Sequence, residues 1–235
     1  MKGMRTIIAI ALTMLCAALA FGGEQMSLHK VRGEVSVRAG VTETWTKANA
    51  GDVLKPDATL KTGKQSSAII LLPTANKKIS LPPEVMVDIS DIRQLTQEEL
   101  MLKLTMERVR ASSYEWKNKE LNTPNTTVVH GPPKDNKEPL AETSSELGVL
   151  EMNGTRVLYD NGFYSTSALR AIDVMRRYPS LGSRFENRLL VAEALEKANL
   201  KSEALNEYVA LSMSQNLSRE QKELLQDKIA QLKRQ

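Results

Sequence analysis

Few side chains in this sequence have the types and spacing that a reactive or metal-binding site needs. The only two histidines, His29 and His130, stand far apart in the chain, and no His-Glu-x-x-His motif occurs. Two isolated histidines favour ordinary surface residues over zinc ligands. Gly63-Lys64 is not a phosphate-binding loop, because Ala58 holds the position of that motif's first glycine.

The remaining candidates for chemistry are equally weak. No Gly-x-Ser-x-Gly or Cys-x-x-Cys motif occurs, and Cys16 is the only cysteine. Glu98 and Glu99 follow Thr96, so they are better explained as negative charges at the start of a helix than as an acid/base pair. We therefore expect no catalytic residue, no cofactor and no metal site, and a protein that is not an enzyme.

The first twenty residues have the layout of a secretory signal peptide. Lys2 and Arg5 precede an apolar stretch over residues 7–19, and Ala18-Leu19-Ala20 forms a small-x-small cleavage site. We predict a signal peptide over residues 1–20 and an exported, periplasmic protein without a transmembrane segment in the mature chain. Retention of this segment as an anchor is the open alternative. Cleavage after Ala20 removes Cys16, which suits a bacterial periplasm better than a disulfide-built module.

The net charge excludes little by itself. A formal charge of +4 is small and, taken along the whole chain, evenly spread, so it does not predict nucleic-acid binding.

Residues 28–90 contain short apolar runs: those around Val35 and Val87 alternate with polar side chains, whereas residues 68–72 are continuously apolar and predict a buried strand. The runs around Val35, Ile70, Ile79 and Val87 are separated by glycine- and proline-containing segments. Several short strands with turn residues between them indicate a compact all-β unit. Gly51 and Gly63 are predicted to take turn conformations that other residues avoid.

This segment resembles the FecR-type domain. The resemblance rests on Val31-Arg32-Gly33-Glu34-Val35-Ser36-Val37, Trp45, Gly51, Leu54, Leu60, Thr62-Gly63, Ser66, Ala68 and Leu81-Pro82-Pro83. It implies an extracytoplasmic β-roll or solenoid-like fold with no catalytic residue. Trp45 is predicted to cap the small core, and a sugar-binding surface at Trp45 is the weak functional alternative.

Thr96 and Glu99 form a capping box that predicts a helix over residues 97–113. Leu100, Leu104 and, roughly, Val109 recur at helical spacing, and Met101 and Met106 beside them favour core filling over a recognition surface. We expect this apolar face to pack on the β unit, which gives a first domain over residues 24–131. Residues 132–144 are polar and contain prolines, so they predict a linker.

The rest of the chain, residues 145–235, resembles degenerate tetratricopeptide-type repeats. The run from Ser167 is similar to the run from Glu203, and small residues at Ala192 and Ala204 allow two antiparallel helices to approach closely. A last polar helix from Ser218 to about residue 233 would end the array. Residues 146–159 are predicted to be a helix, and a β-hairpin about Asn153-Gly154 is the alternative.

Together these patterns predict an α+β protein of two domains: a FecR-like β unit with one packed helix, then an all-α array of helical hairpins. The expected function is that of a non-enzymatic interaction or scaffold protein of the bacterial cell envelope, because helical arrays present surfaces for partner segments. The partner would be another envelope protein or peptide. Binding of an envelope polysaccharide or peptidoglycan through the β unit is the alternative.

Overall fold

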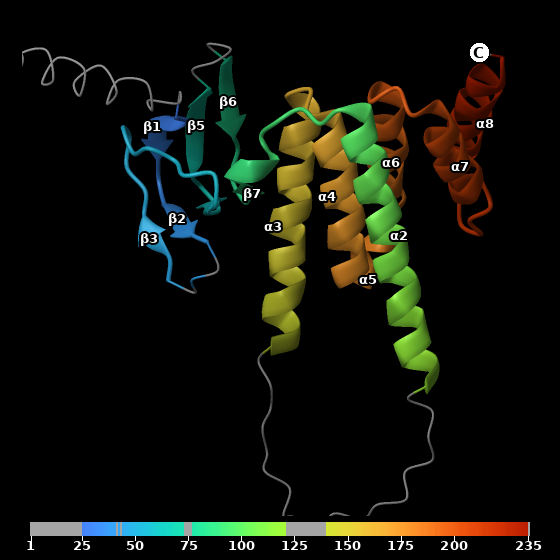
Figure 1. The fold of residues 1–235 in the computed structure, drawn as a ribbon, viewed down its shortest axis with the longest axis horizontal. Helices are drawn as coiled ribbons and strands as arrows, with labels where there is room; N and C mark the ends of the chain where they lie inside the picture. The colour runs from blue at the N-terminus through green and yellow to red at the C-terminus, as the bar shows by residue number, and fades with distance from the viewer. Residues whose placement is uncertain (1–24, 41, 43, 73–76, 121–139, 235) are drawn as a thin grey trace, which may run out of the picture. The chain divides into compact units, whose positions relative to one another are not determined.

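Strands occupy the first part of the chain and helices the second, which confirms the predicted α+β class (Figure 1). The computed structural model describes residues 25–40, 42, 44–72, 77–120 and 140–234, with only the backbone given for residues 112–120 and 140–144. The predicted signal peptide with Cys16, and also His130 and residues 132–139 of the predicted linker, lie outside the described residues.

Within its described residues, the β unit contains six strands in two antiparallel sheets. In one sheet β5 lies between β1 and β6, and in the other β2 lies between β3 and β4. The strands are β1 Ser27–Arg32, β2 Val35–Ala39, β3 Thr46–Lys47, β4 Ala58–Thr62, β5 Ser67–Leu72 and β6 Lys77–Leu81.

The core of the β unit is built from apolar side chains of neighbouring strands. Ile70 of β5 pairs with Leu28 of β1 and Ile79 of β6, and all three side chains are buried. Val35 and Leu60 are buried in the second sheet. Because successive strand residues point to opposite faces, these positions gather on one face of each sheet.

The glycine prediction is correct at one of its two positions. Gly51 has φ +94°, in the left-handed region that favours glycine. Gly63 does not have a positive φ, so that prediction is wrong. Gly63 instead allows close packing in its turn, since an added Cβ would lie 3.3 Å from Ser66 Oγ.

The chain divides into two compact units between Pro83 and Glu84, earlier than the predicted boundary at residue 131. The second unit opens with β7 Met86–Asp88 and the short 3-10 helix η2 Ile89–Asp91, followed by α2 Gln97–Glu120. The start of α2 is as predicted, because Thr96 Oγ1 accepts a hydrogen bond from the Glu99 amide at 3.2 Å.

The packing predicted for α2 is wrong. Leu100 and Leu104, one helical turn apart, belong to the core of the helical unit and not to that of the β unit. The pattern identified Leu100 and Leu104 correctly, but Val109 and Met106 are 59 % and 48 % exposed, so their predicted places in the packed face and the core are wrong. Nothing in the pattern specified which neighbour the buried face would meet.

The other helices form successive antiparallel neighbours. They are α3 Leu140–Asp160, α4 Tyr164–Arg177, α5 Pro179–Gly182, α6 Phe185–Lys197, α7 Lys201–Ser212 and α8 Arg219–Lys233. Residues 146–159 are therefore helical, as predicted, and the hairpin alternative is excluded. The predicted last helix is α8, which begins with a complete capping box of Ser218 and Gln221. In the part of the chain that is described, no helix is long and apolar enough to cross a membrane.

Two helical hairpins, α3–α4 and α6–α7, close with the same turn. Gly162 and Asn199 have φ of +82° and +62°, and the residue after each donates its amide to a carbonyl of the preceding helix. Each turn is therefore a Schellman motif. The shared geometry makes Ser167 equivalent to Ala204, so the predicted alignment of Ser167 with Glu203 is wrong by one residue.

Helices α6 and α7 pack against each other, and Ala192 and Ala204, the small residues predicted between them, are both fully buried. The equivalent residues of the first hairpin are Thr155 and Ser167, which are also fully buried. The Ser167 hydroxyl donates to the Thr155 carbonyl at 2.8 Å. Small side chains therefore hold both hairpins closely packed, with a hydrogen bond added in the first.

Candidate functional site

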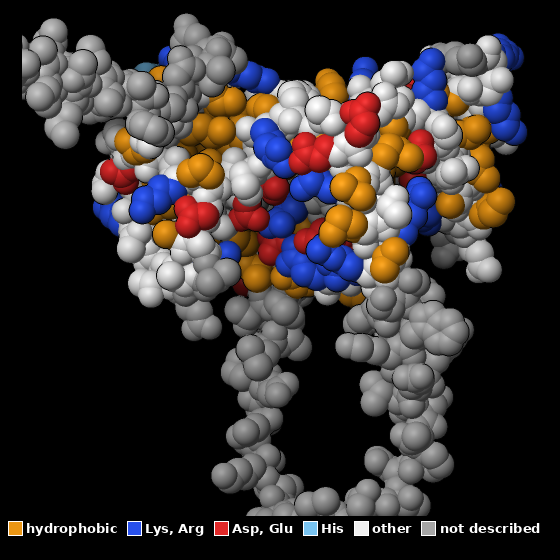
Figure 2. Space-filling view, in the orientation of Figure 1, with side chains coloured by type: hydrophobic (Ala, Val, Ile, Leu, Met, Phe, Trp, Pro, Cys, Tyr) orange, Lys and Arg blue, Asp and Glu red, His pale blue; other side chains and the backbone are white. Residues whose placement is uncertain are grey.

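Helix α2 carries a stripe of exposed apolar side chains on the side away from its buried residues. Leu102, Met106 and Val109 are 63 %, 48 % and 59 % exposed and recur at i, i+4 and i+7, so they line one face of the helix. Figure 2 shows hydrophobic and charged side chains interleaved on the face where α2 lies in front. An exposed apolar stripe of this kind marks an interaction surface more often than scattered single residues do.

A groove of about 560 Å³ runs beside this stripe, between α2, α4 and the residues that follow β7. Leu95 and Leu169 supply apolar lining together with Leu102 and Met106. Its charged and polar lining consists of Ser90, Asp91, Arg93, Glu99, Lys103, Glu107, Arg110, Thr166, Arg170 and Asp173. The groove thus combines an apolar strip with a rim that carries both charges.

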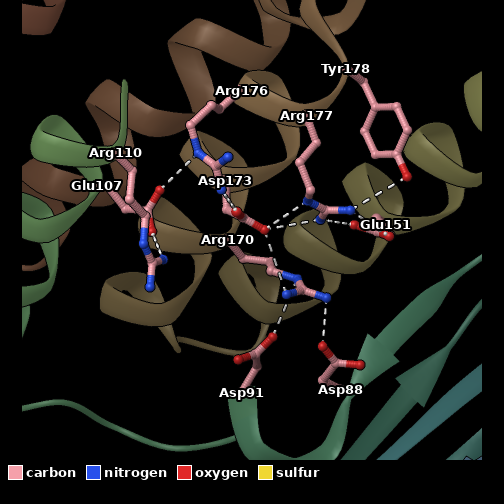
Figure 3. A network of polar contacts seen from close by, with 10 residues as sticks. All are labelled: Asp88, Asp91, Glu107, Arg110, Glu151, Arg170, Asp173, Arg176, Arg177 and Tyr178. Atoms are coloured by element: carbon pink, nitrogen blue, oxygen red, sulfur yellow. Dashed lines mark hydrogen bonds and ion pairs between the residues drawn. The ribbon is translucent and has the colours of Figure 1, made fainter. Parts of the chain in front are cut away.

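Arg170 of α4 is the centre of the charged network under the groove (Figure 3). Its Nη2 donates to Asp88 Oδ2 at 2.5 Å. Its other nitrogens lie 3.6 Å from Asp91 Oδ2 and 3.8 Å from Asp173 Oδ2. One guanidinium therefore faces three carboxylates and ties the segment after β7 to α4.

The next two arginines of α4 extend the network in both directions (Figure 3). Arg176 Nε donates to the buried Glu107 of α2 at 3.2 Å, and Glu107 also pairs with Arg110. Arg177 forms a two-pronged ion pair with the buried Glu151 of α3 and donates from Nε to Asp173 at 3.0 Å. The network therefore joins α2, α3 and α4.

The network also shifts the acidity of its members. Burial lowers the pKa of Arg177, but the hydrogen bonds and the charge of Glu151 outweigh burial and the net shift is upward. Burial is the largest of the effects that raise the pKa of Asp91 to about 6. Arg170 lowers this pKa, whereas the negative charges of Asp88 and Asp173 raise it further. Asp91 Oδ2 is buried and accepts no hydrogen bond among the described residues.

The shift at Asp91 predicts how stability depends on pH. Because its folded pKa is above the ordinary value of 3.8, the folded protein holds this proton more tightly than the unfolded chain does. This contribution is therefore fully present below about pH 4 and is lost as the pH rises to about 6. Above about pH 6 the folded protein instead bears the cost of a buried, ionised carboxylate. Because asparagine carries no charge, we expect Asp91→Asn to remove this cost and raise the free energy of unfolding at pH 7.5 by about 2 kcal/mol relative to wild type.

Urea unfolding of both proteins between pH 4 and 8 measures this difference. The variant and wild-type curves should converge toward pH 4 and separate above pH 6. The exposed Asp227 of α8 provides the control, Asp227→Asn, which should run parallel to wild type. If the unfolding free energies of wild type and Asp91→Asn differ by the same amount from pH 4 to pH 8, the raised pKa of Asp91 is contradicted.

The arrangement stabilises structure and offers little for catalysis. Each carboxylate of the network has an arginine partner. A carboxylate held against arginines is a poor nucleophile, and the raised pKa of Asp91 has a structural cause in its burial. The rim is therefore best read as a set of paired charges around an apolar strip.

The residues singled out from sequence lie away from this groove. Trp45 precedes β3 in the β unit and is half-buried. Its ring centroid lies 4.9 Å from the Arg38 guanidinium carbon and 4.5 Å from Lys61 Nζ. His29 lies at an exposed position, 3.2 Å from Lys78 Nζ.

The glutamates at the start of α2 behave as helix N-terminal charges. The Glu98 backbone amide and the Thr96 side chain lower the pKa of Glu98 by hydrogen bonding. Glu99 pairs with Arg93 at 2.5 Å.

Sequence reasoning missed the network of Arg170 completely. Its members come from β7, η2, α2, α3 and α4, so no local motif contains them. The one signal in the sequence was Asp173 followed by Arg176 and Arg177, which are spaced to pair with it on a helix.

Comparison with known proteins adds no family. No protein-family model matches the sequence, and no significant match was found among curated proteins or solved structures. The FecR and tetratricopeptide resemblances therefore stay predictions.

Proposed function

We propose that this chain is a non-enzymatic interaction or scaffold protein of the bacterial cell envelope, and that the groove beside α2 takes an apolar segment of a partner protein. In this proposal residues 25–83 are a FecR-type domain and the hairpins are degenerate tetratricopeptide-type repeats. The predicted signal peptide supports a periplasmic location. The stripe of Leu102, Met106 and Val109 beside the groove carries the proposal.

The chemistry of the groove defines the partner segment. Leu102 and Met106 remain largely in water although large apolar side chains are usually buried. Methionine adapts its shape to different partners because its side chain is unbranched and polarizable. The paired charges on the rim suit a segment that places apolar side chains on one face and polar groups at its edges, such as an amphipathic helix.

The test is photocrosslinking in cells that export the protein. A photoreactive amino acid at Met106 is expected to give a discrete crosslinked adduct, and the double substitution Leu102→Asp with Val109→Asp is expected to reduce that adduct at least tenfold. These exposed positions should tolerate aspartate without loss of the fold, which circular dichroism and thermal unfolding would verify.

A matched control uses an exposed leucine outside the groove. Leu224 of α8 is 38 % exposed, and Leu224→Asp should leave the adduct unchanged. No adduct at position 106, or equal loss in the Leu224 control, would reject the groove as the partner site.

A further inference from the structure

The positive charge of the chain belongs to the β unit. Residues 25–83 contain nine lysines and arginines against four aspartates and glutamates, whereas residues 84–235 contain 21 against 23. The charge is therefore not evenly spread between the two units, and the expectation of an even spread is wrong. A local excess of one sign attracts ligands of the opposite sign whatever the net charge of the whole chain.

Three of these cations share one face of the sheet formed by β2, β3 and β4. Ser36 of β2 pairs with Lys47 of β3 on one side and with Lys61 of β4 on the other, so the side chains of Ser36 and both lysines point to the same face. Arg38 lies two residues after Ser36 in β2, so its side chain points to this face as well and is the third cation. The buried Val35 and Leu60 point to the opposite face.

None of the three cations is neutralised within the described residues. Arg38, Lys47 and Lys61 form no ion pair there, in contrast to the arginines of α4. Arg38 Nε is buried and lacks a hydrogen-bond acceptor among the same residues. A buried guanidinium nitrogen without an acceptor is costly, so the charge of Arg38 stays uncompensated by these residues.

Trp45 holds two of the cations in place. Its ring lies within 5 Å of both Arg38 and Lys61, at distances where the negative face of an indole attracts a cation. With two cations against it, the ring is poorly placed to stack on a sugar or a nucleobase. Trp45 is thus a positioning residue, which replaces the weaker interpretation of it as a sugar platform.

We propose that this face binds an acidic polysaccharide through Arg38, Lys47 and Lys61. Adjacent strands lie about 4.8 Å apart, so the three cations spread over about 10 Å across β3, β2 and β4. That spread suits a chain of acidic groups better than one small ion. The Ser36 hydroxyl between the two lysines suits a ligand rich in hydroxyl groups. This site is independent of the groove beside α2.

The test uses the mature full-length protein and polygalacturonate, with binding measured by calorimetry at several salt concentrations. Lys47→Glu combined with Lys61→Glu is expected to weaken binding at least tenfold and to reduce its salt dependence. The control is Lys30→Glu combined with Lys55→Glu, which makes the same charge change at exposed positions outside this face and should retain most of the affinity.

Substitutions of Trp45 test the positioning role. Trp45→Leu removes the attraction between the ring and the cations and should weaken polygalacturonate binding, whereas Trp45→Phe should restore most of it.

Three outcomes would overturn the proposal. These are no binding of polygalacturonate, equal loss in the control pair, or tighter binding of single-stranded RNA or phosphatidylglycerol vesicles than of polygalacturonate. Neutral dextran should not bind.

Discussion

Gly154→Ala is expected to destabilise the helical unit by about 3 kcal/mol or more. A Cβ on Gly154 of α3 would lie 1.9 Å from the Met86 carbonyl oxygen of β7. This oxygen belongs to backbone and cannot rotate away, so α3 and β7 would have to separate. The neighbouring Asn153 Nδ2 donates to the Glu84 carbonyl at 2.8 Å and would be disturbed with it.

Chemical denaturation of the variant measures this loss, and Gly182→Ala serves as the control. An added Cβ at Gly182 would meet its nearest atom, Met175 Cβ, at 3.5 Å, which is ordinary contact. The control should stay within about 0.5 kcal/mol of wild type, as substitutions without a specific mechanism usually do. A loss at Gly154 no greater than at Gly182 would show that α3 does not approach β7 this closely.

Arg170→Met is expected to cost about 3 kcal/mol of unfolding free energy. The substitution keeps much of the side-chain packing but leaves Asp88, Asp91 and Asp173 without the cation that they share. Breaking a buried ion pair on one side costs about 3–5 kcal/mol. The lower end of that range applies, because the Arg170 side chain is 27 % exposed and water screens part of the charge.

The loss at Arg170 should also depend on pH, because protonation of the three carboxylates removes the repulsion between them. We expect the destabilisation to shrink as the pH falls below about 5, as measured by urea unfolding. Arg219→Met is the control, since its ion pair with Glu223 is highly exposed and should contribute almost nothing. If Arg170→Met loses the same unfolding free energy at every pH, lost packing and not lost charge destabilises the variant.

Local patterns predicted the elements of this fold well. The alternation around Val35 and the continuous apolar run around Ile70 located strands, and the capping residues Thr96 and Ser218 located the starts of α2 and α8. These features depend on neighbours within a few residues, which the sequence states directly.

The predictions were wrong where a helix could pack against more than one element distant in the sequence. Leu100 and Leu104 marked the buried face of α2, but its partner is α4 and not the β unit.

The one-residue shift in the repeat alignment has a similar cause. Sequence similarity matched Ala168 with Ala204, whereas the backbone turn at Gly162 matches Ser167 with Ala204. Turn geometry sets the register, and a serine replaces alanine there at little cost in volume.

The candidate sites were harder to predict than the fold. The groove depends on which side of α2 stays exposed, and its network joins residues from Asp88 to Arg177. Trp45 was noticed because tryptophan is rare in this chain, but its role depends on Arg38 and Lys61, which only the strand register brings beside it.

The order in which the hairpins pack has a consequence for how the helical unit opens. α7 packs between α6 and α8, and one side chain, Glu196 of α6, links the three helices by accepting bonds from Tyr208 and Lys228. In such nearest-neighbour arrays the terminal helix detaches without disrupting the rest. Local unfolding should therefore proceed inward from α8, and amide hydrogens there should exchange with solvent before those of α4, which is held on several sides.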